Sequence, residues 1–480
     1  MSVRTRLLVS TLLPALALGA CAVGPNYKRP SVETPPAFKE AQGWTPARPA
    51  DGVDKGDWWS MFEDPVLDGL EREVSVSNQT LAADEAAYIE AHAVVNQQRA
   101  SLFPTVNLTG SATRTKHGGS GAQTTSSGQV ISGGGAFNNF QAQLGATWAL
   151  DIWGQIRRGI EAAHAQAQVS DATLANARLS AQSELAADYV GLRIADAQMA
   201  LLSRTVDGYV RALKITQNQY AAGTAARGDV AQAETTLANA KASLVDLQNQ
   251  RAADEHAIAV LTGRAPASLT LAADPNWAPK VPPTPVELPS TLLQRRPDVA
   301  SAERNAAAAN AQIGVQVAGY FPALTLNGSD GFANTAIQSL FKSTSNQWSI
   351  GADVTQTVFN AGATHFKIKQ ARAAYDQAVA QYRQAALTAF QQVEDNLAAA
   401  RVLQDEQPLR EQASSSADQA EQIALNQYKA GTVAYTSVVT AQASALGARQ
   451  TLLTLEGQRM TTAISLVEAL GGGWSGKMRN

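Results

Sequence analysis

The sequence has little of the chemistry that most enzymes and nucleic-acid-binding proteins need. Its 480 residues include a single cysteine and five histidines, so an internal disulfide is excluded and few metal ligands are available. The net charge of -3, from 38 basic and 41 acidic residues, provides no basic surface for nucleic acid. No apolar run reaches the roughly 18 residues that a membrane-spanning helix requires. Aromatic residues make up only 6% of the chain and charged residues only 16%.

Catalytic motifs are missing from the sequence as well. It contains no phosphate-binding P-loop, no H-E-x-x-H and no G-x-S-x-G. Gly471, Gly473 and Gly476 match G-x-G-x-x-G, but they follow a helical pattern, whereas the dinucleotide motif links a strand to a helix. We interpret these glycines as a helix end followed by a tail over 472–480. We expect no enzyme activity, no cofactor and no metal site.

The N-terminus predicts export from the cytoplasm. Arg4 and Arg6 precede a short apolar stretch, and small residues lead to Cys21, which is the pattern of a signal peptide over 1–20. Leu18-Gly19-Ala20-Cys21 resembles the lipobox of bacterial lipoproteins, which implies cleavage before Cys21 and acylation of its thiol. Ala22 rather than aspartate follows, which in such lipoproteins implies delivery to the outer membrane. The alternative is an ordinary signal peptide with an incidental cysteine.

Proline is frequent in the segment 21–54 and predicts an extended tether, because proline cannot continue a helix. Beyond it the sequence repeats itself. The segment 218–224, NQYAAGT, recurs as NQYKAGT at 426–432, an offset of 208 residues. Phe103-Pro104 likewise recurs as Phe321-Pro322. We therefore expect two homologous halves, 55–290 and 291–471, rather than a solenoid of short repeats.

Each half contains a segment in which apolar residues alternate with small or polar ones. This period of two runs from Phe140 to Leu150 and from Trp348 to Thr355, and it predicts strands with one apolar face. With their upstream partners they form two expected hairpins, at about 103–150 and 321–358, connected by 118–135 and 333–346. Their length fits the 9–11 residues of a tilted membrane-spanning strand. A soluble antiparallel sheet has the same alternation and is the alternative.

Long helical segments accompany each hairpin. No proline occurs in 154–220, and the matching segment 362–428 is interrupted only by Pro408. Apolar seven-residue spacing continues beyond these segments, at Val230, Leu237, Leu244 and Ile258, broken by Arg251, and again at Val438, Ala445, Leu452 and Leu466, broken by Arg459. The spacing predicts coiled-coil packing between long helices.

Four strands cannot form a finished membrane structure by themselves. Backbone groups in lipid must all be paired, so a spanning sheet closes into a barrel, usually of at least eight strands. The chain must therefore associate with copies of itself. Strand number alone permits a dimer, a trimer or a tetramer.

The whole pattern resembles the TolC-type outer-membrane efflux factors, in the NodT-like lipoprotein subgroup that serves resistance-nodulation-division pumps. The resemblance covers nearly all of the mature chain. It depends on the motifs CAVGPNY at 21–27, Trp58-Trp59 with Phe62 and Asp64-Pro65, LLQRRPDV at 292–299, Ala302-Glu303-Arg304 and GYFP at 319–322.

This resemblance implies an α+β membrane protein. Three chains would form a twelve-stranded outer-membrane β-barrel, four strands per chain, continued by a twelve-helix periplasmic α-barrel built from two internal repeats. It also implies a lipid-anchored homotrimer of a Gram-negative outer membrane that works with a periplasmic adaptor and an inner-membrane efflux pump. Its function would be passive exit of small toxic compounds. A duct for protein secretion and a non-transporting envelope scaffold are the alternatives.

Two predicted helix turns carry the candidate functional residues. Gly223 and Gly431 interrupt the helical pattern, as expected where a helix ends. By resemblance, these turns are the periplasmic tips that contact the adaptor, through Ala222, Gly223, Thr224, Ala430, Gly431 and Thr432. The resemblance places Asp229, Tyr220 and Tyr428 at the periplasmic aperture.

The second half departs from the family pattern at this aperture. Ser437 corresponds to Asp229, and Val433 stands where some members have an arginine, so we expect a ring of Asp229 carboxylates with tyrosine packing rather than a salt-bridged gate. The alternative for Asp229 is an ordinary acid at a helix start that interacts with the helix dipole. Arg296-Pro297-Asp298 is interpreted as a structural helix start with proline in the first turn.

Overall fold

A computed structural model describes residues 22–41, 57–116, 123–124, 130–131, 136–275, 277–282 and 295–474. The predicted signal peptide and Cys21 lie outside the described residues, as does the end of the C-terminal tail. The chain divides into two compact units. Unit 1 comprises Met1–Pro30, Tyr88–Val169 and Ala302–Tyr382, and unit 2 comprises Ser31–Ala87, Ser170–Ser301 and Arg383–Asn480.

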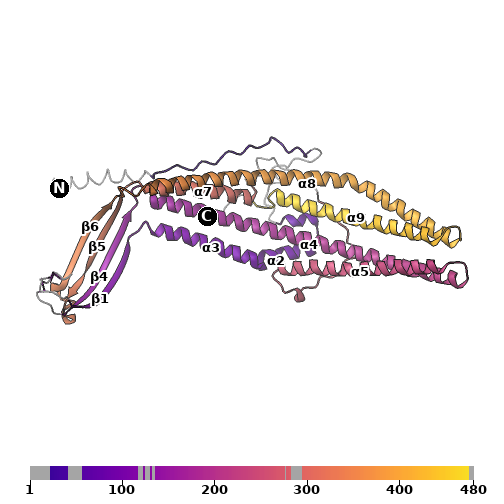
Figure 1. Cartoon of the computed structure of the whole chain (residues 1–480), viewed down its shortest axis with the longest axis horizontal. Helices are drawn as coiled ribbons and strands as arrows, with labels where there is room; N and C mark the ends of the chain where they lie inside the picture. Colours follow the sequence, from indigo (N-terminus) through magenta and orange to yellow (C-terminus); the bar gives the residue numbers. More distant parts are fainter. Residues whose placement is uncertain are drawn as a thin grey trace. The chain divides into compact units, whose positions relative to one another are not determined.

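Helices make up most of the described structure. Their order and bounds, together with those of the main strands, are η3 (Trp58–Phe62), α2 (Pro65–Ser77), α3 (Gln79–Ala100), β1 (Thr105–Lys116), β4 (Ala136–Leu150), α4 (Gln155–Ala221), α5 (Arg227–Leu261), η4 (Pro266–Ser268), α7 (Pro297–Ala318), β5 (Ala323–Asn334), η5 (Ile337–Ser339), η6 (Ser343–Ser345), β6 (Asn346–Thr355), α8 (Ala363–Lys429) and α9 (Tyr435–Ala469) (Figure 1). No described helix is both long enough and apolar enough to cross a membrane.

A four-stranded antiparallel sheet in unit 1 confirms the two predicted hairpins. Its order is β1-β4-β5-β6, so the hairpins β1–β4 and β5–β6 join through the β4–β5 pairing. The register is continuous, and Val106, Ala146, Gly328 and Ile350 lie in one row. Side chains of alternate rows point to opposite faces of the sheet. One face is therefore mainly apolar, and the other carries mainly threonine, serine, asparagine and glutamine.

The connection predicted over 118–135 is not entirely loop. Two-residue strands β2 (Gln123–Thr124) and β3 (Val130–Ile131) pair within it as a separate antiparallel ribbon. This ladder is short, because only Gln123 pairs with Ile131 and Thr124 with Val130.

Corresponding helices of the two halves have equal lengths. α4 and α8 each contain 67 residues, and α5 and α9 each contain 35. The expectation that Pro408 interrupts the second long helix is wrong, because α8 continues through it. Pro408 and Gln404 are both exposed. The Gln404 carbonyl, which loses its partner to the proline ring, can therefore bind water.

The main core of unit 2 surrounds helix α2. Trp58, Trp59 and Phe62 of η3 pack with residues of α2, α4, α5 and α9. Glu71 of α2 is fully buried, and its carboxyl oxygens have no hydrogen-bond partner among the described residues. Burial, with a smaller contribution from Asp68, raises the pKa of Glu71 to about 9, so this acid is neutral at pH 7.

Unit 1 holds the start of the described chain against its helices. The Val23 amide donates to the Trp153 carbonyl at 3.0 Å, and Asn310 Nδ2 donates to the Pro25 carbonyl at 3.0 Å. Arg158 Nε donates to the Val23 carbonyl at 3.2 Å. Residues 22–30 contain no helix or strand, and these contacts hold them against unit 1. The end of the segment predicted as a tether, from residue 42 on, lies outside the described residues.

Candidate functional site

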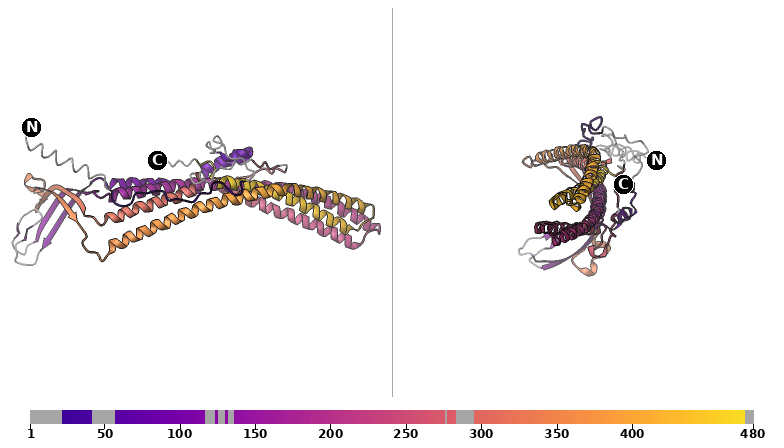
Figure 2. Two further views of the ribbon diagram at one scale, coloured as in Figure 1. Left: turned by 90° about the horizontal axis from the view of Figure 1, so that it is seen from above. Right: turned by 90° about the vertical axis from the view of Figure 1, so that its right-hand side faces the viewer.

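The candidate site comprises the two turns that join α4 to α5 and α8 to α9. Both turns lie at the same end of unit 2 (Figures 1 and 2). Each helix ends in the same way, with glycine in the left-handed conformation, at φ 75° for Gly223 and 74° for Gly431. Residues with a Cβ rarely adopt this backbone, which explains the glycine in both halves.

Threonine completes each turn. The Thr224 amide donates to the Gln219 carbonyl at 2.8 Å, and its hydroxyl donates to the same oxygen at 3.0 Å. Thr432 makes the equivalent pair of bonds to the Gln427 carbonyl, both at 3.0 Å. These bonds satisfy carbonyls that a helix end otherwise leaves free. The six predicted tip residues are exposed in both turns, Ala222, Gly223, Thr224, Ala430, Gly431 and Thr432.

The two tyrosines predicted at the aperture have different environments. Tyr428 is buried, with 6% of its surface exposed, whereas Tyr220 is 47% exposed. The Tyr428 hydroxyl donates to Thr216 Oγ1 at 3.3 Å, so it connects α8 to α4. Tyr428 therefore packs between neighbouring helices within this chain, and the Tyr220 side chain has no such hydrogen bond or ring contact among the described residues.

A third tyrosine, which the sequence reasoning missed, completes the cluster. Tyr435 begins α9 and is 2% exposed, and its ring centroid lies 5.1 Å from that of Tyr428. Ala233 of α5 and Val438 of α9 belong to the same buried cluster as the two rings. The sequence did contain a signal for this cluster. Two tyrosines lie seven residues apart, on either side of a glycine turn, in a chain that is poor in aromatic residues.

Asp229 caps the start of α5. Its Oδ2 accepts a hydrogen bond from the Ala226 amide at 3.1 Å, and its own amide donates to the Ala226 carbonyl at 3.1 Å. Within one chain this is the bond of an ordinary N-terminal acid, which satisfies a free amide and favours the helix dipole. Its charge also acts on the tyrosine cluster. Burial raises the pKa of Tyr435 to about 12, with contributions from Tyr428, Tyr209 and Asp229.

Farther from the turns, ion pairs connect α8 to α9. Arg449 Nε donates to Asp418 Oδ1 at 2.8 Å, and its Nη2 donates to Glu421 Oε2 at 2.9 Å. Both pairs line a groove between α4, α8 and α9, next to the buried Tyr209. Burial and the nearby Glu421 raise the pKa of Tyr209, while Arg449 lowers it.

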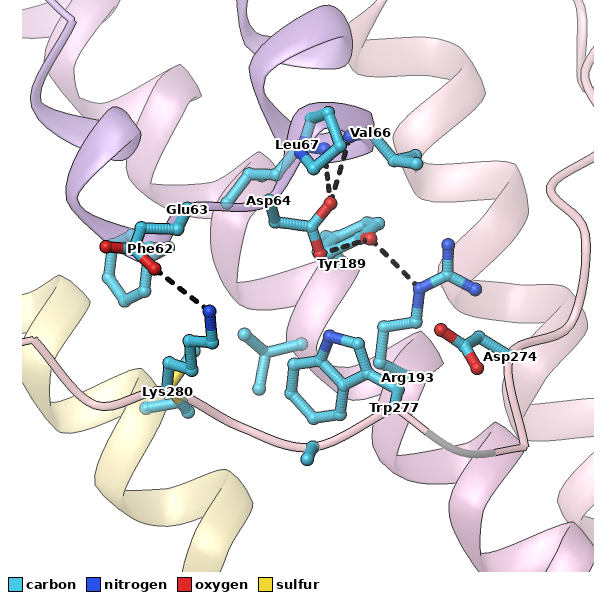
Figure 3. Close-up of a pocket in the computed structure, with 14 residues that line it drawn as sticks. Phe62, Glu63, Asp64, Val66, Leu67, Tyr189, Arg193, Asp274, Trp277 and Lys280 are labelled. Carbon is cyan, nitrogen blue, oxygen red and sulfur yellow. Dashed lines mark hydrogen bonds and ion pairs between the residues drawn. The ribbon is translucent and has the colours of Figure 1, made fainter.

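The motif around Asp64 has a structural role. Asp64 Oδ1 accepts from the amides of Val66 and Leu67, at 2.9 and 3.2 Å, and thus caps α2. Its Oδ2 accepts from the Tyr189 hydroxyl at 2.7 Å, and Arg193 Nε donates to the same hydroxyl at 3.0 Å (Figure 3). The motif therefore fastens the start of α2 to α4.

The Arg296-Pro297-Asp298 motif is structural too, as predicted. Asp298 accepts from the Val299 amide at the start of α7, and Arg296 binds both Asp298 and the carbonyl of Ala469 at the end of α9. Gly471, with φ at 89°, ends α9 there. Gly471 thus lies at a helix end, as interpreted, while the predicted tail beyond residue 474 lies outside the described residues.

The position of Ala22 bears on the predicted lipid site at Cys21. A Cβ on Gly154 would lie 2.7 Å from the Ala22 Cα, so these two backbones are in close contact. Gly154 falls between the end of β4 and the start of α4. The indole of Trp153 stacks there on Phe321, with centroids 4.6 Å apart, and donates to the Pro322 carbonyl. The described chain thus begins at the junction of strands and helices.

Among the described residues, the sheet has one apolar face and two unpaired edges, and the long helices turn back in pairs. These features fit a subunit of an outer-membrane channel. The comparisons agree. The family model of the outer membrane efflux proteins matches residues 71–264 and 288–472, which together make up most of the chain. The chain belongs to this family, and it is an efflux protein of the outer membrane.

Two relatives and one solved structure show the extent of the similarity. The toluene efflux pump outer membrane protein TtgC of Pseudomonas putida is 28% identical over 474 residues, 98% of this chain and 96% of the relative. The cation efflux system protein CusC of Escherichia coli is 28% identical over 468 residues, 96% and 99% of the two chains. The outer-membrane channel OprN has a TM-score of 0.87 and 27% identity, covering 95% of this chain and all of OprN.

Proposed function

We propose that three copies of this chain form the passive exit duct of a tripartite efflux pump. A twelve-stranded barrel, four strands from each copy, would cross the outer membrane, and twelve helices built from two repeats per chain would form the periplasmic tunnel. A periplasmic adaptor would deliver substrate from an inner-membrane transporter. Energy and substrate choice belong to that transporter.

One observation carries this proposal, the unfinished sheet of unit 1. β1 and β6 are its edge strands, and no described strand pairs with their outer sides. Its apolar face is exposed, including Trp348 at 71% and Ile350 at 83%. Hydrocarbon tolerates neither unpaired strand edges nor an open sheet, whereas it stabilises an apolar face. Closure with further copies satisfies both conditions.

The names of the relatives favour small solutes as substrates. Besides toluene and cation efflux proteins, they include the pyoverdine export outer membrane protein OpmQ of Pseudomonas aeruginosa. We therefore favour small toxic compounds over secreted proteins. An envelope scaffold without transport is disfavoured because it needs no membrane-spanning sheet.

Assembly and transport are tested separately. Native mass spectrometry of the detergent-purified protein should give a trimer, and a stable monomer or dimer would refute the architecture. Deletion of the gene, followed by exposure to a broad panel of dyes, solvents, antibiotics and metal ions, should increase sensitivity to some of them. Unchanged sensitivity to the whole panel would refute the efflux duct.

At the tunnel entrance we propose a narrow aperture that includes three Asp229 carboxylates, supported by the tyrosine cluster. The proximity of Asp229 to Tyr435 and the burial of Tyr428 support this arrangement. The exposed tip residues would be the adaptor contacts. In planar bilayers, Asp229→Gln should reduce cation selectivity while retaining an acceptor for the Ala226 amide. Wild-type selectivity in this variant would leave Asp229 a helix cap only.

We also propose that Cys21 carries lipid. The contact of Ala22 with Gly154 supports it, because it holds the start of the described chain between the end of β4 and the start of α4. Mass spectrometry of the N-terminal peptide should show cleavage before Cys21 and the added mass of acyl chains. An unmodified cysteine would refute lipidation without affecting the barrel.

A further inference from the structure

The apolar face of the sheet carries an unexpected carboxylate. Asp330 lies on β5 in the same row as Leu108, Leu144 and Trp348. The surface around Gly328 contains a hollow of about 640 Å³. Asp330 lines this hollow together with Leu144, Ala146, Trp348 and Ile350. A charge on a lipid-facing surface is costly unless it lies near the interface or has a partner.

Within the chain Asp330 is only partly compensated. Its Oδ1 accepts a hydrogen bond from Asn346 Nδ2 at 3.0 Å, and it makes no ion pair with a described residue. The other charged residues on this face of the described sheet are Arg114 and Lys116, both on the edge strand β1. Arg114 is exposed and has no ion pair or hydrogen-bond partner for its side chain among the described residues.

Arg114 cannot reach Asp330 of its own chain. Arg114 pairs with Asn138, and Leu108, six residues earlier on β1, lies in the row of Asp330. At about 3.4 Å per residue the two rows are roughly 20 Å apart. Arg114 and Asp330 can therefore meet only between copies of the chain.

The geometry of the free edges determines how the copies meet. β6 runs antiparallel to the β1 of a neighbouring copy, and side-chain alternation requires apolar residues to oppose apolar residues. β6 has ten residues and β1 has twelve. Only two registers that meet this condition pair all of β6. They place Arg114 opposite either Asn346 or Trp348.

Barrel closure independently requires a similar offset. Strands tilted by about 40° in a twelve-stranded barrel need a shift of roughly four to six residues for each four-stranded copy. Without any shift, Trp348 of one copy would lie opposite Leu108 of the next, because the two residues share a row of the sheet. The two registers differ from this pairing by about four and six residues. In both, only β6 separates Arg114 from Asp330 of the neighbouring copy. The lateral gap, about 10 Å between backbones, is within reach of the two side chains.

We propose that Arg114 of each copy binds Asp330 of its neighbour across β6, with the guanidinium against the exposed ring of Trp348. The partner is a second copy of this chain, so the inference depends on the proposed trimer. Asn346 holds the carboxylate in place, and the ring offers a favourable surface for the cation. The pair neutralises both charges and fixes the register of each subunit seam.

A charge swap tests the pair. Asp330→Arg and Arg114→Asp should each lower the temperature at which the purified trimer dissociates in detergent, and the double variant should regain most of that loss. The matched control combines Asp330→Arg with Thr113→Asp, which places the new acid on the same strand but on the opposite face, and it should regain nothing. Trimer fraction is measured by native mass spectrometry after heating.

The ion pair would be overturned if the double variant dissociates at a temperature no higher than that of the less stable single variant. It would also be overturned if both single variants are as stable as the wild type. A monomeric wild type would instead refute the trimer itself.

A second measurement keeps both charges intact and covers variants that do not fold. Gln347→Cys with either Thr113→Cys or Thr115→Cys should form an oxidised inter-subunit cross-link, one pair for each register. Gln347→Cys with Asn107→Cys should not, and single-cysteine variants control for Cys21. Cross-linking of the Asn107 pair instead would overturn the proposed register.

Discussion

The α4–α5 and α8–α9 turns have the same backbone but different side-chain surroundings. Each ends its helix with a left-handed glycine and a threonine that binds the same carbonyl twice. Tyr220 is exposed beside the first turn, whereas Tyr428 is buried beside the second and its ring packs against that of Tyr435. The repeated sequence thus specifies a scaffold, and the positions that differ between the halves determine which turn is fixed to its neighbours.

The largest expected difference between the turns is at the two tyrosines. Tyr428→Ala should destabilise the end of unit 2 by about 3 kcal/mol, because it removes a buried aromatic side chain and leaves a cavity beside Tyr435. Tyr220→Ala, the matched control, should cost less than about 0.5 kcal/mol at its exposed position. Hydrogen exchange of peptides covering both turns measures these changes.

In planar bilayers Tyr428→Ala should also raise the resting conductance, and Tyr220→Ala should not. Equal effects of the two substitutions would show that in the assembled protein Tyr220 is as firmly packed as Tyr428, so that the asymmetry seen in one chain disappears.

Local patterns in the sequence predicted the scaffold well. The alternation at 140–150 gave the correct strand, face and partner, because one buried or lipid-facing side fixes the register of a sheet. Glycine and the repeated NQY segment located both turns. The 67-residue helix α4 was recognisable because nothing in 154–220 ends a helix.

The side-chain contacts between halves could not be predicted in this way. Whether a tyrosine before a turn is buried depends on the helix beside it, and Tyr428 reaches Thr216, 212 residues away in sequence. Pro408 misled for a similar reason, since its effect depends on its exposed position. Asp330 was not singled out, because its charge becomes significant only once β5 is placed beside the apolar residues of β4 and β6.

The shared backbone of the turns gives a prediction of equal effects. Gly223→Ala and Gly431→Ala should each cost about 1–2 kcal/mol of local stability, because an L residue is strained at these positive φ values. A Cβ would meet no atom within 4 Å at either position, so strain rather than a clash sets the cost. Hydrogen exchange should show matching losses. A marked inequality would mean that adaptor or subunit contacts differ between the turns.

The start of the following helix should show a smaller, one-sided effect. Asp229→Ala should destabilise the first turn of α5 by about 1 kcal/mol, because the Ala226 amide loses its acceptor and the dipole loses a favourable charge. Ser437→Ala, at the equivalent position of α9, should have almost no effect, since the Ser437 side chain makes no hydrogen bond with a described residue. Exchange rates of the first-turn amides of α5 and α9 distinguish the two. Similar losses at both sites would show that capping by Asp229 is not what distinguishes the two halves.

The last difference is absent at neutral pH and appears only at high pH; it concerns Tyr435, which has Arg227 as its counterpart in the first half. Burial and the neighbouring Tyr428, Tyr209 and Asp229 raise the pKa of Tyr435 from 10.0 to about 12. The folded protein therefore holds the phenolic proton more tightly than the unfolded chain. This contribution to the free energy of unfolding is complete below pH 10 and is lost as the pH rises from 10 to 12, by at most about 2 kcal/mol.

Tyr435→Phe should leave stability at pH 7 unchanged, because no described residue binds the hydroxyl, and should flatten the decline above pH 10. Thermal unfolding followed by circular dichroism between pH 8 and 12 measures this, with Tyr220→Phe as the exposed control. The contrary outcome is a stability that falls as steeply above pH 10 in Tyr435→Phe as in the wild type, but not in Tyr220→Phe. The titrating group would then lie in the first turn, and the assignment of the buried cluster to the second half would be wrong.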